Sequence, residues 1–315
     1  MITVLAGGVG AARMLAGLMQ VTDPSELTAI VNTGDDLVLH GLEISPDLDT
    51  VTYTLAGAID PERGWGLAGE TWQAMTTLGR YGGENWFNLG DQDLGTHLYR
   101  TARRHAGATL TEVTAEIAAA WGLGLRLLPM TDDVVRTMVT VEDEGEIGFQ
   151  QYFVGRQHAV AIESVRFDGV ESCAPGPDVL AALAEAETVV IAPSNPIVSI
   201  GPVLAVPGIR SALEKRRDDV VAVSPIIAGA ALKGPADAML AALGHESSAV
   251  GIARIYAEVA GTLVIDEADA DRAAAVEAEG LRCVVTPTVM RTPATAAALA
   301  RTTLAAVGVT TEATR

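Results

Sequence analysis

The segment that decides the fold is residues 2–31, ITVLAGGVGAARMLAGLMQVTDPSELTAIV. It opens with ITVLA at 2–6, a short apolar run typical of a buried strand, and closes with a second such run, LTAIV at 27–31. Between them, GGVG leads into a stretch at about 10–20 where Ala, Leu and Met recur at helical spacing. This order of strand, glycine turn, helix and strand is a βαβ unit, so the sequence predicts two parallel strands.

The same rhythm of apolar strand and Ala-rich helix returns in the second half of the chain. The later strand patterns are TVVIAPSNP at 188–196, DVVAVSPIIAG at 219–229, GTLVIDE at 261–267 and RCVVTPT at 282–288. Continuous apolar strands that alternate with helices are typical of a parallel sheet covered on both faces. The fold class predicted is therefore α/β, a doubly wound, Rossmann-like and mainly parallel sheet.

The middle of the chain has a different pattern. Residues from about 50 to 122 read as several helices that carry the four tryptophans, and 134–167 alternate like a β-hairpin with EDEGE at 142–146 as its turn. We expect residues 50–167 to form an inserted helical and β-hairpin subdomain over the ligand edge of the sheet. Residues 1–49 and 168–315 would then form the nucleotide-binding α/β core, and the final TTEATR is predicted to be frayed.

Composition narrows the class of protein. The 315 residues carry a formal net charge of -19 and show no concentrated basic patch, which disfavours nucleic-acid binding. No signal-peptide pattern opens the chain, and no apolar run approaches the roughly 20 residues that span a bilayer, so a cytoplasmic protein without a membrane partner is expected. Cys173 and Cys283 have no metal-ligand spacing and are predicted to be core residues.

The first candidate site is the glycine loop Gly7-Gly8-Val9-Gly10, which is followed by Arg13. Glycines between a strand and a helix let the backbone approach a phosphate, and the helix N-terminus supplies N–H donors. The motif is no P-loop, because no Gly-Lys-Ser/Thr follows, and Arg13 stands where a dinucleotide fingerprint has its third small residue. A tight turn without a ligand stays open as an alternative.

The second candidate is a group of carboxylates near the carboxyl end of the second strand. Asp35 and Asp36 end the stretch NTGDD at 32–36, and Asp47 and Asp49 follow in SPDLDT at 45–50. Carboxylates at this edge of a parallel sheet suit Mg²⁺, which proteins hold with one or two carboxylates plus substrate phosphates. Capping of a helix at about 50–58 by Asp47 or Asp49 is the alternative.

Two further stretches carry polar groups. Asp93 and His97 are one helical turn apart in LGDQDLGTH, a spacing that allows a metal site or a proton relay but favours a plain intrahelical pair. Ser194, Asn195 and Pro196 lie directly after the strand at 188–192, where two prolines would fix a loop that reads a base, ribose or phosphate. An ordinary turn is the alternative at this position.

Taken together, several motifs resemble those of one family in their order along the chain. They are GGVGAAR, VNTGDD, SPDLDTVTYTLAG, DPERGWG, LGDQDLGTH, LLPMTDD, APSNPIVSIGP and VSPIIAG. From residue 1 to about 305 the chain resembles the CofD family, whose actinobacterial members are called FbiA. The resemblance implies a doubly wound α/β fold with a mainly helical insertion that covers a deazaflavin site.

The activity implied by the resemblance is a Mg²⁺-dependent transfer in coenzyme F-420 biosynthesis. The terminal ribityl hydroxyl of Fo, 7,8-didemethyl-8-hydroxy-5-deazariboflavin, attacks a guanosine diphosphate-linked donor of a phosphorylated three-carbon acid. GMP leaves, and coenzyme F-420-0 or its dehydro form results. Phospholactate, phosphoenolpyruvate and phosphoglycerate are all open as the acid, with the enolpyruvyl form favoured for a chain of bacterial appearance. A homodimer is also implied.

The resemblance also implies roles for individual residues. Donor and GDP binding would fall to the glycine loop with Arg13, and to Ser194, Asn195 and Pro196. Fo would be contacted by Asp49 and by the position before Leu-Gly-Asp, which is often basic in the family but is Asn88 here. Asp49 and Asp36 would be catalytic, and Asp36, Asp35 and Asp49 would bind the metal. Which aspartate acts on the hydroxyl and which on the metal is left open.

Two other classes of protein compete with the transferase. A regulatory protein that binds a nucleotide sugar would use similar glycine and Ser-Asn-Pro loops and would need no deazaflavin pocket. The tryptophans and LGDQDLGTH favour the transferase, because a flat ring needs an apolar or aromatic cleft. A nicotinamide oxidoreductase is disfavoured by the incomplete glycine fingerprint.

Overall fold

A computed structural model describes residues 1–232 and 234–310 of the chain. Its centre is a parallel sheet of seven strands in the order β14-β13-β10-β9-β1-β2-β5. The strands are β1 (Ile2–Ala6), β2 (Leu27–Val31), β5 (Arg126–Pro129), β9 (Thr188–Ile191), β10 (Val220–Val223), β13 (Thr262–Ile265) and β14 (Arg282–Val285). The predicted α/β fold with a doubly wound parallel sheet is confirmed.

Helices cover both faces of this sheet, because alternate residues of each strand point to opposite sides. Val4 of β1 belongs to one apolar core with α1, α2, α5 and α12, and its neighbour Leu5 belongs to the other with α6 to α11. The first set is α1 (Gly8–Leu18), α2 (Pro46–Leu55), α5 (Leu110–Ala120) and α12 (Pro293–Ala305). The second set is α6 (Val179–Glu185), α7 (Ile200–Ala205), α8 (Ile209–Glu214), α9 (Ala236–Ala242), α10 (Ala249–Tyr256) and α11 (Ala273–Ala278).

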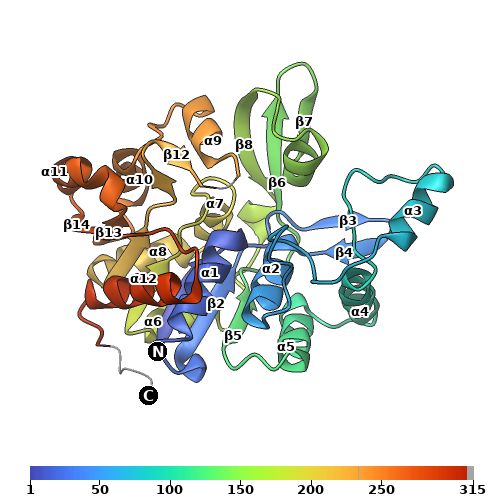
Figure 1. Ribbon diagram of the computed structural model, residues 1–315, viewed down its shortest axis with the longest axis horizontal. Coiled ribbons are helices and arrows are strands. Elements are labelled where there is room, and N and C mark those ends of the chain that lie inside the picture. Colours follow the sequence, from blue (N-terminus) through green and yellow to red (C-terminus); the bar gives the residue numbers. More distant parts are fainter. Residues whose placement is uncertain (233, 311–315) are drawn as a thin grey trace.

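The smaller elements lie beyond the carboxyl edge and one side of the sheet. Figure 1 shows a hairpin of β3 (Leu37–Leu39) and β4 (Leu42–Ile44) beside α3 (Gln73–Arg80) and α4 (Asp93–His105) on the right. Above the sheet stands a three-stranded antiparallel sheet of β6 (Arg136–Val141), β7 (Gly145–Gly148) and β8 (Ile162–Asp168). The predicted hairpin within 134–167 is therefore present, with β8 added as a third strand. A short ladder of β11 (Ile226–Ile227) and β12 (Ala230–Ala231) completes the strands of the described residues.

One strand of the main sheet comes from inside the predicted insertion. β5 pairs with β2 in parallel, from Thr28 with Arg126 to Val31 with Pro129, and α5 packs on it. Residues 50–167 thus contribute to the sheet as well as covering its edge, and the division of the chain at 49/50 and 167/168 stays a prediction. The reason is physical: β5 is a four-residue edge strand that is too short to show a clear period in sequence.

Three smaller predictions concern the cysteines, the membrane and the tail. Cys173 is buried, whereas Cys283 is half-buried on the edge strand β14, and both thiols are free. In the described part of the chain, none of the helices combines the length and the apolar character needed to cross a bilayer. The predicted frayed tail, TTEATR, falls outside the described residues except for its first residue.

The packing of α1 on α12 generates a stability prediction. A Cβ on Gly17 would lie 2.4 Å from the carbonyl oxygen of Ala296, a distance that forces the helices apart. We expect Gly17→Ala to lower the free energy of unfolding by about 1–3 kcal/mol, as overpacking does, in urea denaturation.

The matched control is Gly95→Ala, at an exposed site on α4 where a Cβ meets no atom within 4 Å. This change should leave stability equal or raise it by about 0.5–1 kcal/mol, because Ala is the better helix former. Equal unfolding free energies for the two variants would contradict the tight α1–α12 contact.

Candidate functional site

A cavity of about 650 Å³ opens at the carboxyl edge of the sheet. The strand order reverses at β1, since β2 lies on one side of it and β9 on the other, and the loops after β1 and β9 both line the cavity. Such a switch point separates neighbouring loops and is where open α/β sheets bind ligands. The cavity is therefore the candidate functional site.

The glycine loop and the Pro-Ser-Asn loop are packed directly against each other. A Cβ on Gly10 would lie 2.1 Å from the carbonyl oxygen of Pro193, and a Cβ on Gly7 would lie 2.6 Å from Ser199 Cβ. Ser194 Oγ donates a buried hydrogen bond to the carbonyl oxygen of Gly7 at 2.8 Å. Gly8 has a φ of +67°, in the left-handed region that favours glycine. These glycines are needed for the contact between the loops.

Most of the predicted site residues meet in this cavity. Those that line it are Gly7, Gly8, Gly10, Arg13, Asp35, Asp49, Asn88, Ser194 and Asn195. Asp36 and Pro196 are absent from the lining: Pro196 is buried, and Asp36 is half-buried. The binding and catalytic roles assigned to all of these residues stay predictions.

The polar side chains beside the glycine loop have partial partners. Asn195 Oδ1 accepts hydrogen bonds from the backbone N–H groups of Ile197 and Val198, which fixes the loop, and its Nδ2 lies 3.6 Å from Met239 Sδ. Arg13 is exposed and donates a long hydrogen bond of 3.4 Å to the carbonyl oxygen of Met290. The Arg13 guanidinium therefore keeps donors for an anion.

Two buried carboxylates, Asp35 and Asp47, share one amide. Asn32 Nδ2 donates to Asp47 Oδ2 at 2.9 Å and lies 3.3 Å from Asp35 Oδ1, and Gln150 Nε2 donates to Asp35 Oδ2 at 2.8 Å. Burial, followed by the charges of Asp47 and Asp36, raises the pKa of Asp35 well above its ordinary value. Burial likewise raises the pKa of Asp47 to about 6. Within the described residues neither has an ion-pair partner, so no cationic side chain balances the charge of this cluster when it ionises.

Asp36 points away from the cavity and toward Ser45. Ser45 Oγ donates to Asp36 Oδ2 at 2.8 Å, and Asp36 Oδ1 is buried without a hydrogen-bond partner. Burial raises the pKa of Asp36 to about 7, although this hydrogen bond and the charge of Arg136 act in the opposite direction. Ser45, rather than Asp47 or Asp49, is the N-cap residue of α2, so the capping alternative for those aspartates is wrong.

Asp49 and Arg100 form a buried ion pair between α2 and α4. Arg100 donates from both terminal nitrogens to Asp49, with Nη1 3.2 Å from Oδ2, and the side chains of Arg100 and Asp49 are 3% and 8% exposed. Burial lowers the pKa of Arg100, but the charge of Asp49 more than offsets this, so the guanidinium stays charged. The carboxylate of Asp49 therefore faces the cavity with its charge balanced.

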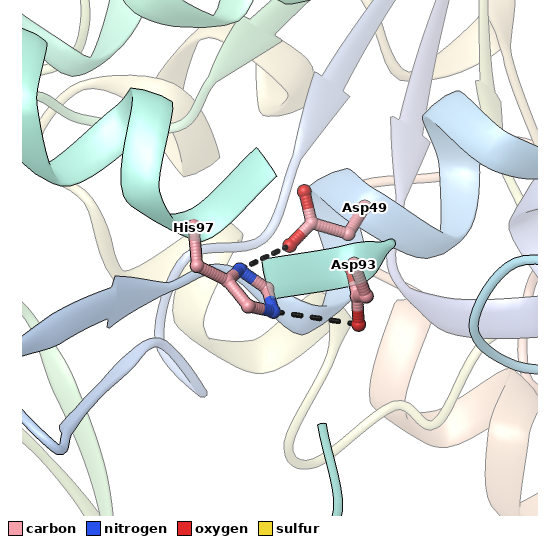
Figure 2. A group of neighbouring side chains, drawn as sticks. All are labelled: Asp49, Asp93 and His97. Atoms are coloured by element: carbon pink, nitrogen blue, oxygen red, sulfur yellow. Dashed lines mark ion pairs between the residues drawn. The ribbon is translucent and has the colours of Figure 1, made fainter. Parts of the chain in front are cut away.

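His97 joins this pair to Asp93, as Figure 2 shows. Its Nδ1 lies 3.7 Å from Asp49 Oδ2, and its Nε2 lies 3.3 Å from Asp93 Oδ2 on the same helix. The intrahelical pair predicted for Asp93 and His97 is thus confirmed. Tyr53 donates from its hydroxyl to Asp93 Oδ1 at 2.6 Å. Burial pushes the pKa of Asp93 up, but His97 and Tyr53 outweigh it and bring the pKa below its ordinary value.

Two groups of carboxylates are candidate ligands for a divalent cation. Asp49, Asp93 and His97 each offer a ligand atom within 4.8 Å of the others. However, Arg100 Nη1 lies 3.2 Å from Asp49 Oδ2 and 3.3 Å from His97 Nδ1, so a guanidinium already supplies the positive charge there. Among the residues that the structure describes, neither Asp35 nor Asp47 forms an ion pair, and Asp47 lies against Gly7 and Gly8. Their hard oxygen atoms therefore fit Mg²⁺ better.

Aromatic rings also line the cavity. Phe149 and Phe153 stack with centroids 5.6 Å apart, and Trp86 packs on Phe87 at 5.7 Å. A Cβ on Gly155 would lie 3.4 Å from the Trp86 ring, so the segment before α4 lies next to the segment after β7. The arrangement suits a flat, apolar ring.

Several of these residues were not identified from the sequence. The sequence places Asp47 among the candidate carboxylates without assigning it a role, and it does not single out Arg100, Tyr53 or Gln150. Arg100 had one available signal, because it lies one turn beyond His97 on the same helix face. Gln150 had none, since its contact with Asp35 joins residues 115 positions apart.

Comparison with known proteins gives a consistent result. The chain matches the family described as "2-phospho-L-lactate transferase CofD" over residues 2–292. It is 47% identical over 310 residues to the phosphoenolpyruvate transferase of Streptomyces griseus, covering 96% of this chain and 97% of that protein. It is 42% identical over 334 residues to the phosphoenolpyruvate transferase of Mycobacterium avium, covering 98% and 99%.

Among solved structures the chain is similar to a member of the UPF0052 family from Bacillus halodurans. The TM-score is 0.63 at 16% sequence identity, covering 96% of this chain and 98% of that one. A second structure from the same organism has a TM-score of 0.58 at 17% identity, covering 91% and 92%. At these identities the likeness supports the fold alone.

The raised pKa of Asp36 generates a prediction about pH and stability. Between about pH 4 and pH 7 the folded protein holds a proton on Asp36 that the unfolded chain has lost, so stability falls as pH rises through this window. We expect Asp36→Asn to have a larger free energy of unfolding than the wild type at pH 8, with both proteins in EDTA so that no metal is bound. The expected gain is on the order of 2 kcal/mol, which allows for the partial exposure of the side chain.

At pH 4 the same substitution should change stability little, because the carboxyl is then neutral in the folded protein. Thermal unfolding of both proteins at several pH values measures this difference. If the stability difference between the two proteins stays constant from pH 4 to pH 8, folding does not raise the pKa of Asp36.

Proposed function

The chain belongs to the CofD family of 2-phospho-L-lactate transferases, and from that premise we propose that it transfers phosphoenolpyruvate to Fo. The donor is a guanosine diphosphate-linked enolpyruvyl compound, and GMP is the leaving group. The observation that carries this proposal is one cavity that joins a glycine loop at a switch point to an aromatic lining and two hydrogen-bonded carboxylates. The enolpyruvyl acid is chosen because relatives at 42–47% identity bear the name phosphoenolpyruvate transferase.

The donor would lie against the two packed loops. The backbone of Gly7 and Gly8 and the start of α1 offer N–H groups and a partial positive charge to phosphate oxygens. Arg13 adds a cation, and Ser194 and Asn195 face the same space. The net charge of -19 does not oppose this binding, since these groups act at contact distance.

The acceptor would lie against the aromatic lining, with its ribityl chain toward Asp49. The deazaflavin ring stacks near Trp86 and the Phe149–Phe153 pair, and Asn88 contributes an uncharged polar contact. Asp49, whose charge Arg100 balances, accepts a hydrogen bond from the reacting hydroxyl and orients it. Orientation rather than strong base catalysis is what this type of phosphoryl transfer needs.

Asp35 and Asp47 would hold Mg²⁺ beside the donor's phosphates. Asp35 was predicted as a metal ligand and fits this role. Asp36 and Asp49 were predicted as well, but Asp36 faces Ser45 and Asp49 faces Arg100. Asp47 is therefore proposed as the second ligand in their place. Bound Mg²⁺ would supply charge neutralisation for the phosphate oxygens. The hydroxyl oxygen forms a bond to the enolpyruvyl-bearing phosphorus, its proton passes to Asp49 late in the step, and the bond from that phosphorus to the GMP oxygen breaks. A cytoplasmic homodimer is part of the same proposal.

The direct test is product analysis by mass spectrometry. Purified protein is incubated with Fo, Mg²⁺ and each of three guanosine pyrophosphate donors, which carry enolpyruvyl, lactyl or glyceryl acids. We expect dehydro coenzyme F-420-0 and GMP with the enolpyruvyl donor. A product with another donor would correct the acid, and nucleotide binding without any product would favour a regulatory nucleotide-sugar-binding protein.

A second test separates the metal-binding aspartates from the hydroxyl-binding one. Asp47→Asn should raise the Mg²⁺ concentration for half-maximal activity by roughly 10-fold or more, as the loss of a metal contact does. Asp49→Asn should abolish turnover and leave donor binding, measured by calorimetry, nearly intact. Loss of donor binding in Asp49→Asn, with an unchanged melting temperature, would instead make Asp49 a metal ligand.

A further inference from the structure

We propose that Asp49 and Asp93 form a hydroxyl clamp, in which the two carboxylates bind two neighbouring hydroxyl groups of the acceptor's polyol chain. The inference rests on the proposed function and deepens it. It gives Asp93 a role as a substrate-binding residue that determines specificity for a polyhydroxylated acceptor. Arg100, His97 and Tyr53 are its positioning residues.

The two carboxylates come from different helices and meet at the cavity. Asp49 lies in the first turn of α2 and Asp93 is the first residue of α4, and both line the cavity. Oxygen atoms of the two lie within 4.8 Å of each other, and each carboxylate faces one nitrogen atom of the His97 ring in Figure 2. Hydroxyls donate to carboxylates at about 2.5–2.7 Å, so two acceptors at this spacing suit hydroxyls on adjacent carbon atoms.

Each carboxylate has hydrogen-bonding capacity left for a ligand. Asp49 receives two N–H groups from Arg100, and Asp93 receives the hydroxyl of Tyr53 and faces His97 Nε2. An ionised carboxylate offers about four acceptor sites, so neither is saturated by these contacts. Their side chains are only 8% and 13% exposed, and both line the cavity, so further donors reach them from that side.

The surroundings favour neutral hydroxyl donors over a cation. The Arg100 guanidinium lies between Asp49 and His97 and already balances one negative charge. Burial, followed by the charges of Asp49 and Asp93, raises the pKa of Tyr53 far above its ordinary value, so this phenol stays a donor and fixes the orientation of Asp93. A polyol adds hydrogen bonds here without adding charge.

The decisive experiment compares two acceptors in two proteins. The acceptors are Fo and an analogue that lacks the hydroxyl next to the reacting one, and kcat/KM is measured for each with saturating donor. For the wild type, kcat/KM should be at least about 10-fold lower with the analogue than with Fo, which is the effect of losing one hydrogen bond to a charged group. For Asp93→Asn, kcat/KM should differ by less than about threefold between Fo and the analogue. The remaining amide oxygen accepts from Tyr53, and the amide nitrogen stands where the wild type has its second acceptor oxygen.

Glu116→Gln is the matched control. Glu116 also accepts from a tyrosine hydroxyl and pairs with an arginine of α4, but it lies on α5 and outside the cavity lining. It should keep the wild-type discrimination between the two acceptors. Tyr53→Phe serves as the second variant: it removes the donor that orients Asp93 and should lower the discrimination part of the way.

The outcomes separate the two proposals. Equal discrimination in wild type, Asp93→Asn and Tyr53→Phe overturns the hydroxyl clamp and leaves the transferase standing, since wild-type turnover of Fo is read in the same assay. Absence of wild-type product with every donor overturns the proposed function. In that case the clamp is tested by measuring the binding of Fo and of the analogue through fluorescence quenching. If wild type and Asp93→Asn show the same ratio of the two affinities, the clamp is overturned.

Discussion

The site depends on the absence of side chains at Gly7 and Gly10. A Cβ on either residue would meet the loop after β9 at 2.6 Å or less, so any other residue would push the loops after β1 and β9 apart. Because the loops touch, Ser194 can donate to the carbonyl oxygen of Gly7 across 187 positions of sequence. This contact sets one wall of the cavity, and it holds the start of α1 at that wall, where Gly8, Val9 and Gly10 line the cavity. The glycines are therefore needed for loop packing as well as for any approach of a phosphate.

The carboxylates around the cavity differ in how their charge is balanced. Asp49 is paired with Arg100 and Asp93 is hydrogen-bonded by its neighbours, so these two acceptors are fixed and need no further cation. Asp35 and Asp47 share one amide and have no ion pair in the described chain, and burial raises the pKa of both. Buried charge without a partner is costly, and a cation or a proton relieves it. This difference is the physical basis for assigning metal to one pair and hydroxyl groups to the other.

Local sequence patterns predicted the sheet and its loops, whereas contacts between residues far apart in the sequence could not be predicted from them. The strands at 2–6, 27–31 and 188–192 were readable because each is an apolar run beside a turn signal, and the loops that follow them carry most of the lining. Asp36 was grouped with Asp35 because the two are adjacent, but adjacent residues face different ways, and only one reaches the cavity. Arg100 was missed because its partner Asp49 lies 51 positions away, and no local spacing reports such a pair.

The arrangement of α2 and α4 explains why an ordinary helical pair can belong to a site. An Asp and a His at i and i+4 usually stabilise their own helix, and the contact between Asp93 and His97 does so here. The difference is that α2 meets this pair, so that Asp49 lies 3.7 Å from His97 Nδ1 and Tyr53 donates a hydrogen bond to Asp93. Groups held on two packed helices keep their geometry better than groups on loops. The part of the cavity around Asp49 and Asp93 is thus built on helices, and the part around Gly7 and Ser194 on loops that the glycines hold together.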